Sequence, residues 1–436
     1  MQGELKYTSP DWIGFTFPII RQRNWIHSWW RLRLTSLRNT HIYERESDDK
    51  NAATRKGLIK VVSPIPYMNL SEKKVGELLS TGLFDADYYL SMYPDVYLSQ
   101  LDPLLHYLYF GHIENRNPST KFDTQFYRSN YMSENQRFCP LIHYLMREDS
   151  GGVKLRSDNA IEIDISEKQL DSNSRLALQI HVYYPSHFNE IVTKVKKIPS
   201  RIDLLVSTTS EMELKTIAQI ATRASLQNKT EFRVVNNVGR DQAPLFVGFA
   251  DTWSKYDYIC HLHSKQSPHT EFGDRWRNYL FDQLIGSRSI VTGIISLFER
   301  DDNIGVIYPD NYFEIKPYVG WNGNEEYVTE FLKKAGFTNF EITEKEPDLL
   351  AGSMCWMRTA AYAPLNHSFL SYSHFEPEEG QLEGTLAHIL ERCLTVIPVL
   401  NGYRTCKYFN GIQNVEAYRN AWAKSHGHPD ADLSGT

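Results

Sequence analysis

The sequence predicts an α/β fold, in which a mostly parallel β-sheet carries helices on both faces, preceded by a small all-α module. Two observations lead to this prediction. From residue 175 onward, short apolar runs rich in β-branched and aromatic residues alternate with segments of helical period. Such alternation favours a parallel sheet with crossover helices. Upstream, residues 84–148 contain two similar copies of one helical segment.

Length and composition indicate a packed protein with more than one unit. At 436 residues the chain is long enough for two or three units of roughly 100–200 residues each. The hydrophobic content of 41% argues against disorder over most of the length. A formal net charge of -6 argues against a dedicated nucleic-acid-binding protein, which would carry a basic excess. Five scattered cysteines without a CxxC pair indicate neither a disulfide framework nor a cysteine zinc site, and suit a reducing cytoplasm.

Residues 1–79 predict a basic, aromatic segment followed by a charged linker. They lack the pattern of a signal peptide, and no run in the chain reaches the roughly 18 apolar residues of a membrane span. Residues 20–45 combine five arginines with three tryptophans. This composition fits either contact with lipid head groups or a helix packed on its own protein. We therefore expect a cytoplasmic protein, with peripheral contact at the inner face of the cytoplasmic membrane as an option left open by residues 20–45.

Residues 80–150 predict a helical repeat module for scaffolding or contacts. The stretch FDADYYLSMYPDV at 84–96 resembles FDTQFYRSNYMSE at 122–134, and Pro103 recurs as Pro140. Proline suits the first turn of a helix, so each copy predicts a helical hairpin whose second helix begins at that proline.

Two histidines, His106 and His143, recur with the repeat. A histidine inside an apolar, aromatic helix is more often a hydrogen-bonded core residue than a ligand. We expect both rings to be packed inside the module.

Residues 175–410 predict the α/β domain, and residues 411–436 a C-terminal tail. The expected strands cover residues 175–184, 201–210, 231–238, 256–264, 304–310 and 349–358. The expected helices lie within residues 187–198, 211–225, 269–287, 325–336 and 375–392. In such sheets ligands bind beyond the carboxyl ends of the strands, near the switch in strand order. The polar residues that end the predicted strands are therefore the candidate site.

Six motifs in this half of the chain occur in a recognisable order. They are LALQIHVYYP, IDLLVSTTS, NNVGRDQAPLF, YDYICHLHSKQSPH, LLAGSMCWMR and HFEPEEGQLEGTLAHILER. Together, over roughly residues 175–408, they resemble the rhamnan synthesis protein F family of bacterial polysaccharide glycosyltransferases. The repeat at 84–148 resembles a module found beside such enzymes.

The resemblance implies a GT-A-like domain with hexosyltransferase activity. Such an enzyme would move a sugar from a nucleotide-sugar donor onto a growing, lipid-linked glycan of the cell envelope, such as lipopolysaccharide O-antigen, capsule or rhamnan. Rhamnose is the sugar that the family's name favours.

A sugar transferase needs positive charge or hydrogen-bond donors for the departing diphosphate, and a base for the acceptor hydroxyl. Arg240 follows the Gly239 turn directly after a predicted strand, and its planar guanidinium matches two phosphate oxygens. We predict Tyr184, Arg240 and Asp241 as donor-binding residues. An exposed salt bridge between Arg240 and Asp241 is the structural alternative.

At the end of a predicted strand, every second residue is basic or a histidine: His261, His263 and Lys265. Residues at this spacing project to the same side of a strand. GT-A enzymes commonly hold a metal with an Asp-x-Asp motif at such a strand end, and here histidines take that place. Two imidazoles could bind Mn²⁺, whereas Mg²⁺ prefers oxygen ligands. We favour a metal-free donor site in which these three residues offset the diphosphate charge. A divalent cation, Mn or Mg, is the alternative, but HxH without a third spaced ligand is a weak metal signal.

Two further motifs complete the predicted site. Gly352 and Ser353 are small residues that let a ligand or another backbone approach closely, and the family places them beside the donor sugar; a packing bulge is the alternative. The acidic run within residues 375–392 should supply the base. Its candidates are Glu379 and Glu383, with Glu376 and Glu378 behind them, and Asp241 is the third catalytic candidate.

Two other functions fit the same residues. One is a catalytically inactive sugar- or partner-binding scaffold of a polysaccharide assembly complex, which the missing Asp-x-Asp motif favours. The other is a metal-dependent hydrolase built on the histidines.

Overall fold

The computed structural model describes most of the chain from residue 78 to residue 425. Its described ranges are 78–133, 136, 138–147, 151–166, 170, 172–264, 272–342, 349–365, 369–379, 383–412 and 415–425. Residues 77–436 form one compact unit. Residues 20–45, the expected basic and aromatic segment, and Lys265 lie outside the described residues.

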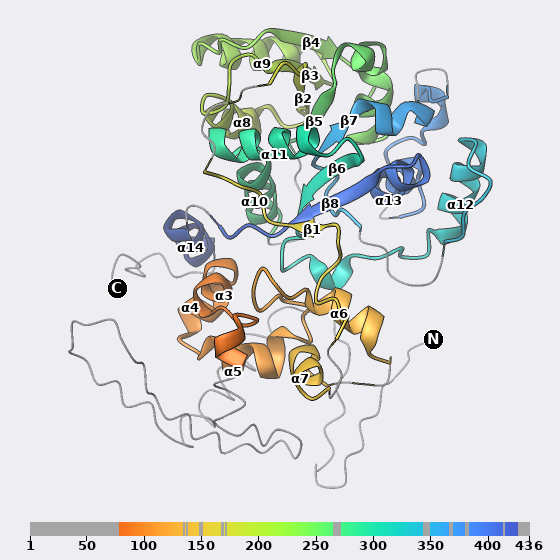
Figure 1. Ribbon diagram of the computed structural model, residues 1–436. Helices are drawn as coiled ribbons and strands as arrows, with labels where there is room; N and C mark the ends of the chain where they lie inside the picture. Colours follow the sequence, from red (N-terminus) through yellow and green to blue (C-terminus); the bar gives the residue numbers. More distant parts are fainter. Residues whose placement is uncertain are drawn as a thin grey trace. The chain divides into compact units, whose positions relative to one another are not determined.

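An eight-stranded sheet forms the centre of this unit (Figure 1). The strands are β1 (Ala160–Ile161), β2 (Leu176–His181), β3 (Asp203–Thr208), β4 (Thr230–Val234), β5 (Tyr258–His263), β6 (Ile304–Pro309), β7 (Cys355–Arg358) and β8 (Arg404–Tyr408). Their order is β1-β8-β6-β7-β5-β2-β3-β4. Strand β7 runs antiparallel to β5 and β6, and the other neighbouring pairs are parallel. The predicted α/β fold with a mostly parallel sheet is therefore confirmed.

Helices cover both faces of the sheet, as strand β7 shows. Successive side chains of a strand point to opposite faces. Cys355 and Met357 belong to the core cluster that contains residues of α13 (Leu386–Leu400), whereas the Nε1 of Trp356 donates to Leu284 O of α10 (Gly273–Ile285) at 3.1 Å. Helices α8 (Phe188–Val195) and α11 (Arg288–Arg300) pack against α10, α9 (Glu211–Arg223) packs against α8, and α12 (Glu325–Lys334) packs against α13.

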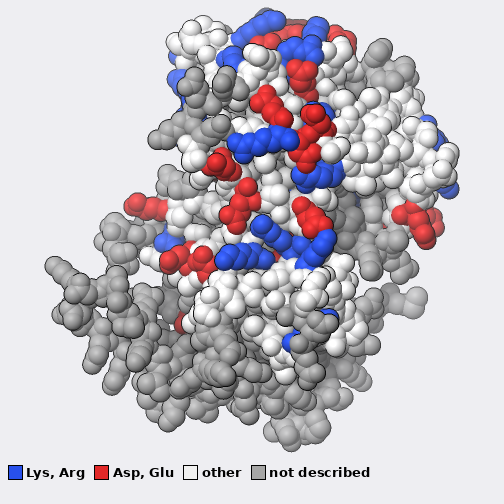
Figure 2. Space-filling view, in the orientation of Figure 1, with Lys and Arg blue, Asp and Glu red and all other residues white. Residues whose placement is uncertain are grey.

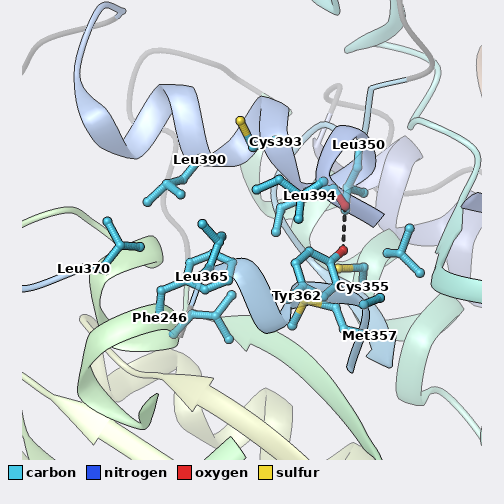
Figure 3. Close-up of a cluster of buried hydrophobic side chains, with 14 of the residues drawn as sticks. Phe246, Leu350, Cys355, Met357, Tyr362, Leu365, Leu370, Leu390, Cys393 and Leu394 are labelled. Atoms are coloured by element: carbon cyan, nitrogen blue, oxygen red, sulfur yellow. Dashed lines mark hydrogen bonds between the residues drawn. The ribbon is translucent and has the colours of Figure 1, made fainter. Parts of the chain in front are cut away.

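The core cluster beneath α13 holds the start of β7 in place (Figure 3). Pro398 lies inside α13 and has no N–H, so the carbonyl of Leu394 lacks its usual helical partner. The Tyr362 hydroxyl donates to that carbonyl at 2.5 Å (Figure 3). Tyr362 thus satisfies a buried acceptor and fastens α13 to the segment that follows β7.

The helical repeat module contains α3 (Ala86–Met92), α4 (Pro94–Ser99), α5 (Pro103–His106), α6 (Thr124–Tyr131) and α7 (Pro140–Leu145). Pro103 and Pro140 occupy the first positions of α5 and α7, as predicted. The Tyr89 hydroxyl is hydrogen-bonded to His106 Nδ1 at 2.9 Å. In the second copy Tyr127 and His143 repeat that bond at 2.9 Å. His106 is buried as predicted, whereas His143 is only partly buried.

Buried charges join the module to the sheet. Asp85 and Asp123 cap α3 and α6 through the backbone N–H groups of Tyr88 and Phe126. Asp85, in the first copy, is exposed. Asp123, in the second copy, is buried, and its Oδ2 lies 3.2 Å from Nζ of Lys407 on β8. Both members of that pair are less than a tenth exposed.

Several strands and helices differ from the sequence prediction. Strand β7 begins at Cys355 instead of residue 349, because Gly352 and Ser353 adopt left-handed φ angles of 86° and 61° that a strand cannot contain. Strand β4 ends at Val234, four residues early. The sequence prediction did not include β1, β8 and α11. Residues 411–436, predicted as a tail, contain α14 (Val415–Ser425), which packs against α4.

Among the described helices, none combines the length and the apolar character that crossing a bilayer requires.

Candidate functional site

A buried polar ladder crosses the sheet near the carboxyl ends of its central strands. The register of β2 and β5 places Gln179 beside His261, and His181 beside His263. Side chains at paired positions project from the same face. His261 Nδ1 is hydrogen-bonded to Gln179 Oε1 at 2.5 Å, and His181 Nδ1 to Ser207 Oγ of β3 at 3.1 Å. These side chains, which we call the histidine ladder, are all at most 5% exposed.

Asp241 reaches the histidine ladder from the loop after β4. Its Oδ2 lies 3.2 Å from His261 Nε2 and 3.9 Å from His263 Nε2. It also accepts a hydrogen bond of 2.6 Å from Gln242 Nε2. One ligand atom from each of Asp241, His261 and His263 lies within 4.8 Å of the others. The structure therefore supplies the third group that HxH lacks in the sequence.

The turn before Asp241 meets the acidic loop before α13. Gly239 and Arg240 both have left-handed φ angles, 67° and 54°, and for Arg240 this conformation is costly. Val238 forms an isolated β-bridge with Pro377. The backbone N–H of Arg240 donates to Glu378 Oε1 at 3.1 Å, and its Nε lies 3.7 Å from Glu378 Oε2. The cationic turn and the acidic loop are thus adjacent.

The four carboxylates of the acidic loop have different surroundings. Glu376 accepts from the backbone N–H of Leu386 at 3.0 Å, at the start of α13. Glu383 accepts from Arg392 Nη2 with both oxygens, at 2.7 and 2.8 Å, and from Asn324 Nδ2 at 3.0 Å. Glu379 is exposed and follows Glu378 directly. The guanidinium of Arg392 thus fixes Glu383 against α13.

Gly352 connects the histidine ladder to α13, and the adjacent Ser353 is 3% exposed. The carbonyl oxygen of Gly352 lies 2.9 Å from His263 Nε2. The backbone N–H of Gly352 donates to Glu391 Oε1 at 2.9 Å. A Cβ at Gly352 would lie 2.8 Å from the ring of Trp276, so this glycine is required for close packing. The turn at Gly352 therefore both packs against Trp276 and contacts His263.

The model of the family described as rhamnan synthesis protein F matches residues 144–403. The chain belongs to this family. The family segment contains every site residue described above, from Gln179 to Arg392. It links the chain to polysaccharide synthesis.

Two curated relatives are also similar to this chain. Both are the uncharacterized protein WxcX of Xanthomonas campestris pv. campestris, one from strain B100 and one from strain ATCC 33913; each is 27% identical over 228 residues. The match covers 52% of this chain but 31% of each relative, so the chain spans about a third of their length.

One similar solved structure is glucosyl-3-phosphoglycerate synthase from Mycobacterium tuberculosis in complex with Mn²⁺, uridine-diphosphate and glucosyl-3-phosphoglycerate. It is 9% identical, with 59% of this chain and 82% of that chain covered at a TM-score of 0.25. Overlap at this level supports no conclusion about this chain.

Tyr184, a predicted donor-binding residue, lies just beyond the end of β2. Its backbone N–H donates to Ser264 Oγ at 2.9 Å, and its ring lies 5.9 Å from that of His187. Because Lys265 lies outside the described residues, the structure does not relate it to Tyr184 or Arg240.

Sequence reasoning missed Gln179 and His181, although a signal existed. They are polar residues two apart in the otherwise apolar strand LALQIHVYY, so both must face the same side. Burial lowers the pKa of His181 to about 3, with Asp241 opposing the shift and the neighbouring histidines adding to it. His181 is therefore neutral at physiological pH.

Acidic and basic side chains are interspersed over the face that Figure 2 shows. The visible described surface on this face carries no broad area of one sign.

Proposed function

We propose that this chain is a glycosyltransferase of cell-surface polysaccharide assembly, which moves a sugar from a nucleotide-sugar donor to a growing, lipid-linked glycan. Family membership supports the link to polysaccharide synthesis. The observation that carries the proposal is the contact between the turn at Arg240 and the acidic loop at Glu378, beside the carboxyl ends of parallel strands. A cation and a base at one sheet edge are what sugar transfer needs.

Arg240 is the proposed partner of the donor diphosphate. Its side chain is 39% exposed, so an incoming phosphate can reach the guanidinium. Its ion pair with Glu378 is loose, at 3.7 Å, and a bidentate contact with phosphate oxygens would be stronger. Lys265 stays a proposed second cation, and Tyr184 a proposed contact of the donor at the same edge.

Glu379 is the proposed base. As the acceptor oxygen bonds to the anomeric carbon, the carbon–oxygen bond to the diphosphate breaks, and the nucleotide leaves with the bonding electrons. The acceptor's hydroxyl proton passes to the carboxylate. Glu379 is exposed and lies next to Glu378, which contacts Arg240. Glu383 accepts hydrogen bonds from Arg392 and Asn324, and we assign it the role of positioning the loop.

The decisive experiment is a screen of purified full chain with a panel of nucleotide sugars, dTDP-rhamnose included, and a lipid-linked acceptor. Donor binding is measured by calorimetry and turnover by nucleotide release. We expect Arg240→Ala to weaken donor binding roughly 10- to 100-fold, the value of one charged hydrogen-bond pair. Arg404→Ala is the matched control, because Arg404 is 34% exposed and paired with Asp301 elsewhere on the sheet.

Glu379→Gln should lower kcat by about 10²- to 10⁴-fold while donor binding persists. Glu383→Gln should lower the free energy of unfolding, since it breaks the contacts to Arg392. It should lower kcat less than Glu379→Gln does. Equal loss of kcat in both variants would refute the assignment of the base. If no donor binds the wild-type chain, the transferase proposal is wrong and the inactive scaffold becomes the better function.

A further inference from the structure

The cluster of Asp241, His261 and His263 has the geometry of a ligand set around one cation. Asp241 Oδ2 lies 3.2 Å from His261 Nε2 and 3.9 Å from His263 Nε2. Ligands at about 2.0–2.2 Å from one metal ion are separated by about 3–4 Å from each other. We infer that these three residues bind a single transition-type divalent cation, such as Mn²⁺ or Zn²⁺.

The neighbour of His261 fixes which ring nitrogen is available. The oxygen of Gln179 lies 2.5 Å from His261 Nδ1, and an amide oxygen only accepts hydrogen bonds. Nδ1 therefore carries the proton, and the lone pair of Nε2 points at the carboxylate of Asp241. Two acceptors 3.2 Å apart need either a proton or a cation between them. A metal-ligating histidine commonly has such an outer partner on its second nitrogen.

The surroundings of His263 fit the same cation. His263 is 4% exposed, and its Nε2 lies 2.9 Å from the carbonyl oxygen of Gly352. A carbonyl oxygen only accepts, so without a cation this nitrogen carries the proton and donates it. A cation that displaces this proton gains both His263 Nε2 and the Gly352 carbonyl oxygen as ligands. The cluster is therefore built from two imidazoles, a carboxylate and an adjacent carbonyl, which come from β5, from the loop after β4 and from the turn before β7.

The types of ligand atom determine which class of metal ion this cluster binds. Two histidines and one carboxylate recur as ligands of transition metals, whereas Mg²⁺ and Ca²⁺ prefer oxygen ligands alone. Mg²⁺ should therefore bind this cluster poorly. This inference depends on the cluster's own geometry and does not require the proposed sugar transfer.

The test uses the full chain after treatment with a chelator and dialysis. Calorimetry with Mn²⁺, Zn²⁺ and Mg²⁺ should give one tight site per chain for the first two cations, and binding at least about 100-fold weaker for Mg²⁺. The electron paramagnetic resonance spectrum of bound Mn²⁺ should show coupling to nitrogen. Neither readout depends on enzyme activity.

Variants identify the ligands. His261→Ala and Asp241→Asn should abolish the tight site, and Gln179→Leu should weaken it roughly 10- to 100-fold, as expected for an outer partner. His181→Ala is the matched control, because His181 belongs to the same ladder but not to the ligand cluster. Circular dichroism of each variant confirms that it is folded.

A proton on His261 Nε2 is the other occupant that would satisfy Asp241. In that case the wild-type chain binds neither Mn²⁺ nor Zn²⁺, and the inference is overturned. Equal loss of binding in His181→Ala and His261→Ala would also overturn it. Donor binding that persists without metal would leave the proposed function intact while the metal site fails, so the two failures are distinguishable.

Discussion

His106 should make the folded protein sensitive to mild acid. Burial, with Arg116 adding to it and Asp95 opposing, lowers the pKa of His106 to about 3. In the unfolded chain an ordinary histidine has a pKa of about 6.5, so between these values only the unfolded state takes up the proton. Stability therefore falls as pH falls from about 6.5 toward 3, by about 1.36 kcal/mol per pH unit for this one group.

Between pH 6.5 and 4.5, protonation of His106 in the unfolded chain alone should lower the free energy of unfolding by about 2.3 kcal/mol. His112 and His181, whose pKa values are lowered by burial to about 4 and about 3, add to the slope of the wild-type chain. His106→Gln removes one of these protons, so its unfolding free energy should fall less steeply over the same range. Urea unfolding followed by tryptophan fluorescence at several pH values measures both slopes.

The internal repeat offers a matched control at His143. It makes the same 2.9 Å bond to a tyrosine hydroxyl, but its ring is only partly buried. Its pKa is lowered by burial and by Arg147, so His143→Gln should change the slope in the same direction but by less. A slope in His106→Gln equal to that of the wild type would refute the reasoning, whatever the absolute loss of stability.

Three further changes test the packing around the site. Lys407→Met leaves the buried carboxylate of Asp123 without the lysine 3.2 Å away, and should cost about 3–5 kcal/mol in urea unfolding; a loss below 1 kcal/mol would show that water replaces the lysine. Tyr362→Phe leaves the Leu394 carbonyl without a donor and should cost about 1–3 kcal/mol by the same assay, with no change expected in donor binding. Gly239→Ala puts a side chain at a φ of 67° where an aromatic ring already lies, and should weaken donor binding as well as stability; unchanged calorimetry would contradict a role for this turn.

The sequence by itself determined the features that depend on local periodicity. Alternating strands and helices predicted the α/β sheet, and the repeat with Pro103 and Pro140 predicted the helical hairpins. The period of two along a strand placed His261 and His263 on one side, because side chains alternate between the faces whatever the rest of the chain does. The register of β5 with β2 agrees with that placement.

Only the tertiary structure decided which distant groups meet these histidines. Asp241 lies 20 residues before His261, and Glu378 lies 138 residues after Arg240. No local period relates such positions, because the crossover order of the strands and the paths of the loops bring them together. The left-handed turn at Gly352, which shortens β7 and directs a carbonyl at His263, is set in the same way by packing against Trp276. Local sequence pattern thus determines which side chains lie at the sheet edge, and long-range packing determines which residues they contact.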